Sequence, residues 1–158
     1  LRPDLATRFA TYNATRPPGH SGMGTTLSAN PLQFAALLAT LTQVATPTAL
    51  AKMERGAQRL ATGLSCAIAA HGAPWHVVRV GARVEFICAP GPLRNGFEAA
   101  RAHAPEVEAV THLALLNRGS LIAPFHNMML VSPVTTRAQI DRLVANFHAV
   151  LGMLFSKD

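Results

Sequence analysis

Apolar residues recur at helical spacing in five stretches of the chain, separated by residues that start or stop helices. The first stretch is short and covers residues 5–13. The second covers about 31–45 and is apolar on most of its sides, which is typical of a helix buried between two bodies. The third begins at Thr46-Pro47 and ends at Gly72, because a cap residue followed by proline starts a helix and glycine ends one.

Two further helices are predicted in the second half of the chain. One has apolar residues at helical spacing over 107–116 and ends at 117–119. The other opens with Thr136 and Gln139, which have the spacing of a capping box, and continues as an amphipathic helix almost to the end of the chain.

Between these helices the period changes to two, which favours strands. The segment 75–89, WHVVRVGARVEFICA, is rich in β-branched and aromatic residues, so we expect two strands joined at Gly81. Two shorter strands are expected at 120–123 and 128–132. This order of elements predicts an α/β (α+β) fold in which helices pack on a small mixed sheet.

Composition changes this picture little. The 158 residues are 49% hydrophobic, which suits one domain with a substantial core. Gly, Thr, Gln and charged residues interrupt every long apolar run, so no membrane span is expected. The net charge is +6, but the arginines occur singly and no aromatic residues alternate with them, which disfavours a nucleic-acid partner.

Cysteine and histidine add no predicted metal site. Cys66 and Cys88 lie far apart without CxxC spacing, and we expect both to be buried free thiols in a reducing compartment. The seven histidines form neither an HxH nor an HExxH motif.

The segment HSGMGTTLSANPLQFAALLATL, residues 20–41, contains the main candidate site. Asn30 and Pro31 fit the N-cap and first position of the second helix, whose first turn carries unpaired N–H groups that favour a phosphate. In the preceding loop, Gly22 and Gly24 let the backbone approach a phosphate closely. Thr25, Thr26 and Ser28 add hydroxyl donors. It contains no lysine, so it is not a Walker-type loop. A flexible loop before an ordinary N-cap explains the same residues, and local chemistry leaves both explanations open.

The part GTTLSANPLQFAALLATL resembles the G-T-x-S-G-N-P-L-x-x-A-A-x-x-A-T-L segment of class III pyridoxal-phosphate-dependent aminotransferases, closest to the glutamate-1-semialdehyde aminomutase-like branch. Later segments agree in the same order: MERGAQRL, VRVGARVEF, LALLNRGSLIAPFHNMMLVSP and TTRAQIDRLVANFHAVL. The resemblance covers residues 20 to about 155. It implies a fold-type-I enzyme in which 1–46 hold the end of the large cofactor domain and the long interdomain helix. Residues 47–158 would then form the small C-terminal domain, with a mostly antiparallel sheet.

The resemblance also implies a cofactor, pyridoxal 5'-phosphate, and a homodimer. Thr26 would hydrogen-bond the phosphate of the cofactor bound in the neighbouring subunit, and Thr25 and Ser28 are further candidates. The chain departs from the family pattern twice: Thr25 stands where glycine is usual, and Ala29 replaces glycine. At the second position the backbone must therefore not need a positive φ.

The chemistry of this family needs a lysine that forms a Schiff base with the cofactor, and in relatives it lies upstream of the Gly-Thr motif. This chain has only Lys52 and Lys157, both expected at the surface. None of Asp4, Asp141 and Asp158 has a context that suits pairing with the pyridine nitrogen. We therefore expect no catalytic residue here and an inactive chain in isolation. The missing initiating Met agrees with a C-terminal portion of a longer enzyme.

The resemblance indicates candidate substrate-binding residues in only one loop. Ornithine-type relatives carry an arginine where this chain has Met129, so we expect no substrate carboxylate to be held there. Phe125, His126 and Asn127 are the candidate substrate-binding residues at the cleft entrance; a packed turn between two strands is an equal alternative. Four other conspicuous side chains receive structural interpretations. Arg118 is expected to cap the end of its helix, and Trp75 is expected in the core rather than as a platform for a ligand. Arg79 and Arg83 could face the substrate or the solvent, and we expect the solvent.

The leading hypothesis is a C-terminal segment of a cytoplasmic, homodimeric aminotransferase or aminomutase that takes an amine or amino acid and an oxo acid. This segment would contribute cofactor-phosphate contacts and one wall of the substrate cleft. The alternative is a truncated, non-catalytic module for oligomerisation or small-ligand binding. Neither a nucleic acid nor a membrane is an expected partner.

Overall fold

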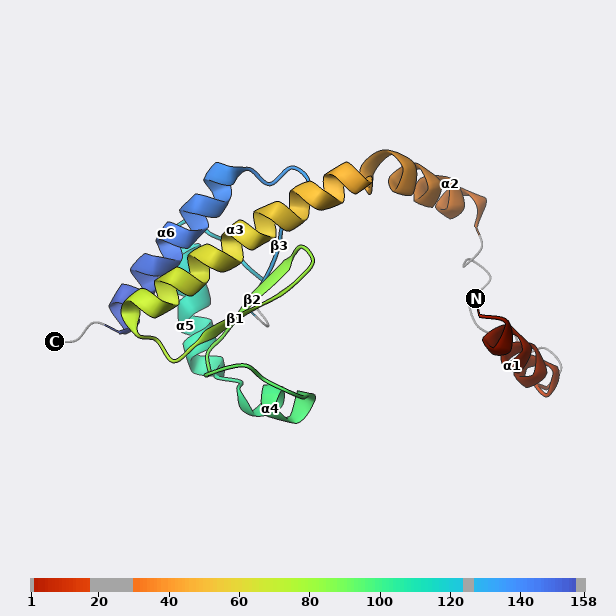
Figure 1. The fold of residues 1–158 in the computed structure, drawn as a ribbon, viewed down its shortest axis with the longest axis horizontal. Helices are drawn as coiled ribbons and strands as arrows, with labels where there is room; N and C mark the ends of the chain where they lie inside the picture. The colour runs from red at the N-terminus through yellow and green to blue at the C-terminus, as the bar shows by residue number, and fades with distance from the viewer. Residues whose placement is uncertain (1, 18–29, 124–126, 156–158) are drawn as a thin grey trace. The chain divides into compact units, whose positions relative to one another are not determined.

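A computed structural model describes residues 2–17, 30–123 and 127–155 of the chain. The chain divides into two compact units, Leu1–Ala45 and Thr46–Asp158, and each is described by itself (Figure 1). The division falls beside the boundary expected between 1–46 and 47–158. The assignment of the two parts to a large and a small domain stays a prediction.

The first unit consists of helices whose ends are set by local capping. It contains α1 (Pro3–Ala14) and α2 (Pro31–Ala39), which a π-helical turn, η1 (Thr40–Val44), continues. As predicted, Asn30 caps α2: its side-chain oxygen accepts a hydrogen bond from the Leu32 amide at 2.8 Å, and Pro31 occupies the first helical position.

No described side chain of the first unit is buried. The apolar residues that predicted burial of α2 and its continuation are instead exposed within their own unit, and these are Leu32, Phe34, Leu37, Leu38, Leu41 and Val44. A helix apolar on most sides gains little stability in water. The unit on its own therefore does not supply the burial that its sequence predicts.

The second unit opens with the long helix α3 (Pro47–His71), whose predicted ends are both confirmed. The Thr46 hydroxyl accepts a hydrogen bond from the Ala49 amide at 3.2 Å, and Pro47 starts the helix. Gly72 ends it in the left-handed region, with φ of 62°. Glycine is favoured there because it has no Cβ to clash with the backbone.

A three-stranded antiparallel sheet follows α3, in the order β1-β2-β3. The strands are β1 (His76–Val80), β2 (Arg83–Ile87) and β3 (Met128–Leu130). The predicted turn between the first two strands is confirmed at Gly81, where φ is 56°. The register pairs Val84 with Arg79 in β1 and with Met129 in β3.

The strand predicted at 120–123 is wrong. One backbone hydrogen bond, from the Ala123 amide to the Met128 carbonyl at 3.2 Å, joins this segment to β3. The Ser120 amide instead donates to the Leu115 carbonyl at 2.9 Å, which ties the start of the segment to the preceding helix. A single bond does not make a ladder, so the segment runs as irregular chain.

Three more helices complete the unit: α4 (Gly96–Arg101), α5 (Pro105–Leu116) and α6 (Arg137–Leu154). Sequence periodicity did not predict α4 because six residues are too few to show it. The capping box that opens α6 is confirmed in both directions, since Thr136 and Gln139 each bond the other's backbone amide. The side chain of Arg118 donates to the Ala114 carbonyl at 3.1 Å, the predicted role at the end of α5.

The core lies between α3, α6 and one face of the sheet (Figure 1). Trp75 is buried, as predicted, and its ring stacks on Phe86 with 5.7 Å between the ring centroids. Phe147 of α6 packs against Phe86 at 4.8 Å. Alternate residues of β2 and β3 face this core, whereas Glu85, Met128 and Leu130 face away from it.

Within the described residues, no single helix has both the length and the apolar composition of a membrane span. Pro31–Val44 and Pro47–His71 meet that test only when they are taken together as a broken pair.

Candidate functional site

Most of the predicted site lies outside the described residues. This holds for the phosphate candidates Thr25, Thr26 and Ser28 and for Phe125 and His126 of the substrate candidates. Asn127 is described, and so are the residues that follow both loops.

The start of α2 has few free backbone amides that could bind a phosphate. Pro31 has no amide hydrogen, and the Leu32 amide is already bonded to the Asn30 side chain. The Phe34 amide bonds the Asn30 carbonyl at 3.1 Å, so Gln33 has the one first-turn amide without an acceptor among the described residues. The helix terminus offers few donors of its own, and the hydroxyl groups of the preceding loop would have to provide the rest.

Asn127 is buried and conformationally unusual. The residue is 5% exposed, and its φ of 44° lies in the left-handed region, which asparagine tolerates better than most residues. It lines a hollow of about 260 Å³ together with Glu85, His103 and Glu108. The imidazole of His103 lies 3.1 Å from the Glu108 carboxylate, so polar groups gather beside the loop that carries the substrate candidates.

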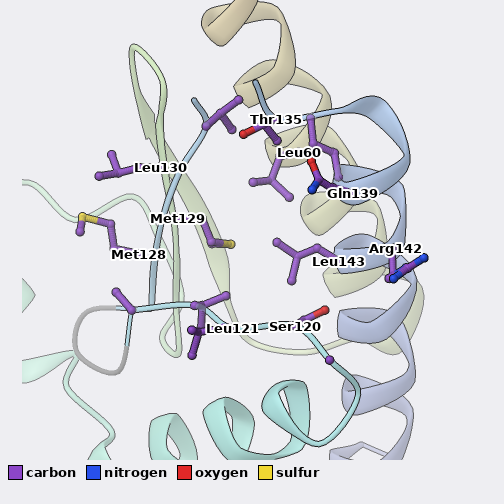
Figure 2. Close-up of a pocket in the computed structure, with 15 residues that line it drawn as sticks. Leu60, Ser120, Leu121, Met128, Met129, Leu130, Thr135, Gln139, Arg142 and Leu143 are labelled. Carbon is purple, nitrogen blue, oxygen red and sulfur yellow. The ribbon is translucent and has the colours of Figure 1, made fainter. Parts of the chain in front are cut away.

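A second, larger hollow of about 580 Å³ lies between β3 and the first half of α6. Figure 2 shows Leu60, Met129 and Leu143 pointing into it, with Ser120 at its lower rim. The head group of Arg142 points to the outer side of α6, away from the hollow (Figure 2). Met129 thus faces an apolar interior, and it is 7% exposed. The sequence did not reveal this hollow, because its walls come from four separate segments.

One side chain of α6 fixes the entry to the candidate substrate loop. The Asn146 amide group donates to the Arg118 carbonyl at 3.0 Å and to the Ser120 hydroxyl at 2.8 Å. Ser120 is nearly buried, so this hydroxyl depends on its partner. Asn146 therefore anchors the segment that leads to residues 124–127, a role that the sequence pattern did not indicate.

Cys88 is not an activated nucleophile. Burial, with a smaller contribution from the nearby Glu108 carboxylate, raises the pKa of Cys88 to about 12, which keeps the thiol protonated and unreactive. Both cysteines are free, but Cys66 is exposed and Cys88 is half-buried, so the prediction that both are buried is wrong. It lies on the outer face of α3, where the helical pattern places no core residue. Lys52 is exposed on α3, as predicted.

Each of the two described aspartates forms an ion pair with an arginine. Arg2 binds Asp4, and Arg59 binds Asp141 through two hydrogen bonds of 2.6 and 2.9 Å. The hydrogen bonds from Arg59 hold the pKa of Asp141 below its usual range. Each of these carboxylates is thus paired with an arginine at the surface of its own unit.

Comparisons with known proteins agree with this architecture. No protein-family model matches the chain. Among curated proteins, it is 33% identical over 139 residues to a glutamate-1-semialdehyde 2,1-aminomutase of Desulfosudis oleivorans, covering 87% of this chain and 32% of that protein. A second such aminomutase, from Bacillus anthracis, is 32% identical over 140 residues with the same coverage.

Solved structures give the same answer. A glutamate-1-semialdehyde aminomutase from Pseudomonas aeruginosa, crystallised in complex with PMP, superposes with a TM-score of 0.86 at 38% identity. The match covers 96% of this chain and 34% of that one. A β-phenylalanine aminotransferase from Variovorax paradoxus superposes with a TM-score of 0.75 at 29% identity, over 96% of this chain and 34% of its own.

The mixed helical fold with a small antiparallel sheet is thus that of a part of the pyridoxal-phosphate-dependent aminotransferases. Within this class the chain belongs to the class III family, on the glutamate-1-semialdehyde aminomutase-like branch. The chain spans about a third of the length of the relatives that it matches.

Proposed function

We propose that this chain is the C-terminal portion of a pyridoxal-phosphate-dependent aminotransferase or aminomutase, and that the complete protein works as a cytoplasmic homodimer. The observation that carries the proposal is the match to the Pseudomonas aeruginosa aminomutase, which was crystallised with PMP and superposes over 96% of this chain. Pyridoxal phosphate supplies an electron sink for amino-group transfer.

Thr26 is the proposed phosphate ligand, assisted by Thr25 and Ser28. The donor chemistry suits the group, because hydroxyls bind phosphate oxygens and the start of α2 carries a partial positive charge. Asn30 and Pro31 leave few free amides there, so side-chain donors matter more than backbone ones. The phosphate would belong to the cofactor of the neighbouring subunit.

Phe125, His126 and Asn127 are the proposed substrate-side residues. The buried, left-handed Asn127 and the adjacent polar hollow support this assignment, because both place hydrogen-bonding groups beside the loop. Met129 lies on the core face of β3 and offers no cation for a carboxylate. The substrates would be an amine or amino acid and an oxo acid.

The Schiff-base lysine would come from outside this sequence. The only lysines are Lys52 and Lys157, and Lys52 is exposed on α3. We therefore expect the 158-residue chain alone to be inactive. The competing function is a non-catalytic module for oligomerisation or small-ligand binding.

Borohydride reduction of the protein from its native source, followed by intact-mass analysis, separates these two functions. A mass well above that of 158 residues, with a pyridoxyl adduct on an upstream lysine, supports the proposal. A mass equal to that of the chain, without an adduct, overturns it in favour of the binding module.

The role of Thr26 has its own test in the complete enzyme. Thr26→Val should weaken cofactor affinity by about 1 to 3 kcal/mol, the range for a lost hydrogen bond to a charged group. Thr42→Val is a matched control, because the Thr42 hydroxyl donates to the Leu38 carbonyl of its own helix at 2.7 Å. Unchanged affinity in Thr26→Val would remove this residue from the site.

A further inference from the structure

Two histidines from distant parts of the sequence meet at the surface of the second unit. His71 is the last residue of α3 and His148 lies in α6, 77 positions later. The Nε2 atom of His71 lies 3.1 Å from the Nδ1 atom of His148, in a hydrogen bond whose donor depends on the ring tautomers. The rings meet edge to face, with 4.4 Å between centroids and 70° between planes. His148 is exposed and His71 is half-exposed, so solvent reaches the pair.

The separation of these two nitrogens is that of two ligands on one metal ion. Imidazole nitrogens bind zinc at about 2.05 Å, and at that length a nitrogen–nitrogen distance of 3.1 Å gives an angle of about 98° at the metal. This angle lies between the octahedral and tetrahedral values. Imidazole is a preferred ligand of divalent copper, nickel and zinc.

The surrounding packing holds the two helices that carry these rings close together before any ion arrives. Helices α3 and α6 pack closely where Gly63 of α3 faces Val144 of α6. Two hydrogen bonds between Arg59 and Asp141 also join the two helices. Gly152 makes room for the His71 ring, because a Cβ there would lie 3.3 Å from its Cε1 atom. A preorganised pair loses less conformational entropy on binding than two free side chains would.

We infer that His71 and His148 form a surface site for a divalent transition metal ion, with water completing its coordination. His71 would bind through Nε2 and keep its proton on Nδ1, and His148 would bind through Nδ1 and keep its proton on Nε2. Binding would replace the hydrogen bond between the rings, and both rings would rotate until their lone pairs point to one ion. No group of three or more His, Cys, Asp or Glu ligands occurs among the described residues, so two protein ligands define the site.

The inference is independent of the proposed cofactor site, and it has a structural consequence. An ion on this pair links the end of α3 to α6, and it binds the folded unit alone because the two histidines are far apart in the unfolded chain. Metal binding therefore stabilises the unit by mass action.

The test uses the complete holoenzyme, freed of metal by dialysis against a chelator and titrated with Cu²⁺ at about pH 8, where free imidazole is neutral. We expect a site whose electron paramagnetic resonance signal carries the coupling of two imidazole nitrogens. His71→Ala and His148→Ala should each weaken this site at least about tenfold and remove the two-nitrogen pattern, because the remaining ligand is a single imidazole. His103→Ala, at another exposed histidine, should change neither quantity.

Thermal unfolding gives a second readout. Ni²⁺ should raise the melting temperature of the unchanged protein but not that of the His71→Ala/His148→Ala double variant, and Mg²⁺ should raise neither. If an alanine variant does not fold, His71→Asn and His148→Gln replace it with a side chain that retains polarity. Equal copper affinity in the parent and these variants, or a two-nitrogen signal that survives either substitution, would overturn the inference.

Discussion

Leu64 of α3 and Phe147 of α6 are completely buried in the second unit, whereas in the first unit no described side chain is buried. Both units contain helices with well-placed caps and many apolar residues. The difference lies in what their helices pack against. In the second unit α3, α6 and a sheet close a core around Trp75 and Phe86, and among the described residues of the first unit α2 has no such partner.

This comparison separates local from non-local information. Capping residues and proline positions are sufficient to start and stop α2, because they act on the nearest backbone groups. They do not provide burial. The large exposed apolar face of α2 is the kind of surface that interaction sites present.

The largest expected change in stability comes from removing one phenylalanine ring in each unit and comparing the two results. Phe147→Ala should lower the free energy of unfolding of the second unit by about 3 to 5 kcal/mol, because it empties a fully buried site. Phe34→Ala, at a residue that is 56% exposed, should leave that unfolding unchanged. Denaturant unfolding followed by the fluorescence of Trp75, the single tryptophan, measures both. Equal effects would show that α2 shares the core of the second unit.

A smaller effect is expected where α3 and α6 approach closely. A Cβ on Gly63 would lie 2.6 Å from the Cγ2 atom of Val144, so Gly63→Ala must push the helices apart or strain the valine. Such overpacking costs about 1 to 3 kcal/mol. Gly96→Ala is the matched control, because nothing lies within 4 Å of the added atom. Removing bulk on the other helix with Val144→Ala should restore part of the loss, measured by the same Trp75 signal.

The elements of the second unit were predictable to the extent that their signals are local. The Thr46-Pro47 start, the Gly72 stop and the Thr136 capping box act within one turn, and each prediction is confirmed. The strand at 120–123 was predicted wrongly because β-propensity describes a segment, whereas a strand needs a partner along its length. The same limit applies to the contact of His71 with His148, which depends on how α3 packs on α6.

The candidate site divides in the same way. The Gly-Thr-Thr-Leu-Ser-Ala-Asn-Pro segment is contiguous, so its resemblance to a family could be found from sequence. The anchor that Asn146 provides for Ser120 joins residues 26 positions apart, and no pattern in either segment indicates it. Non-local hydrogen bonds of this kind become visible only once the fold brings the segments together.

The hydrogen bonds from Asn146 to Arg118 and Ser120 can be tested by mutation. Asn146→Ala removes two hydrogen bonds and leaves the nearly buried Ser120 hydroxyl without its donor, at a cost of about 1 to 2 kcal/mol. Hydrogen exchange should rise in 118–123 and not in α3. Gln58→Ala is the control, because the Gln58 side chain bonds only the Thr62 hydroxyl on the exposed face of α3. An unchanged exchange rate in 118–123 would show that Asn146 does not hold this segment.

The smallest effect is expected from the surface ion pairs, which occur in both units. Arg59 lowers the pKa of Asp141 by hydrogen bonding, and the pair joins α3 to α6 across 82 positions. Because the folded pKa is the lower one, the stabilisation is present above the unfolded pKa and is lost as the pH falls through the folded pKa. Asp141→Asn should thus lower the melting temperature of the second unit near neutral pH, and the difference should vanish in strong acid.

Asp4→Asn is the counterpart in the first unit, where Arg2 also lowers the carboxyl pKa but the pair joins residues two positions apart. An ion pair between residues two positions apart does not join separate elements of the fold. This variant should therefore leave the melting temperature of the second unit unchanged at every pH. A difference between Asp141→Asn and the parent that persists in acid would mean that the carboxylate charge is not what links the two helices.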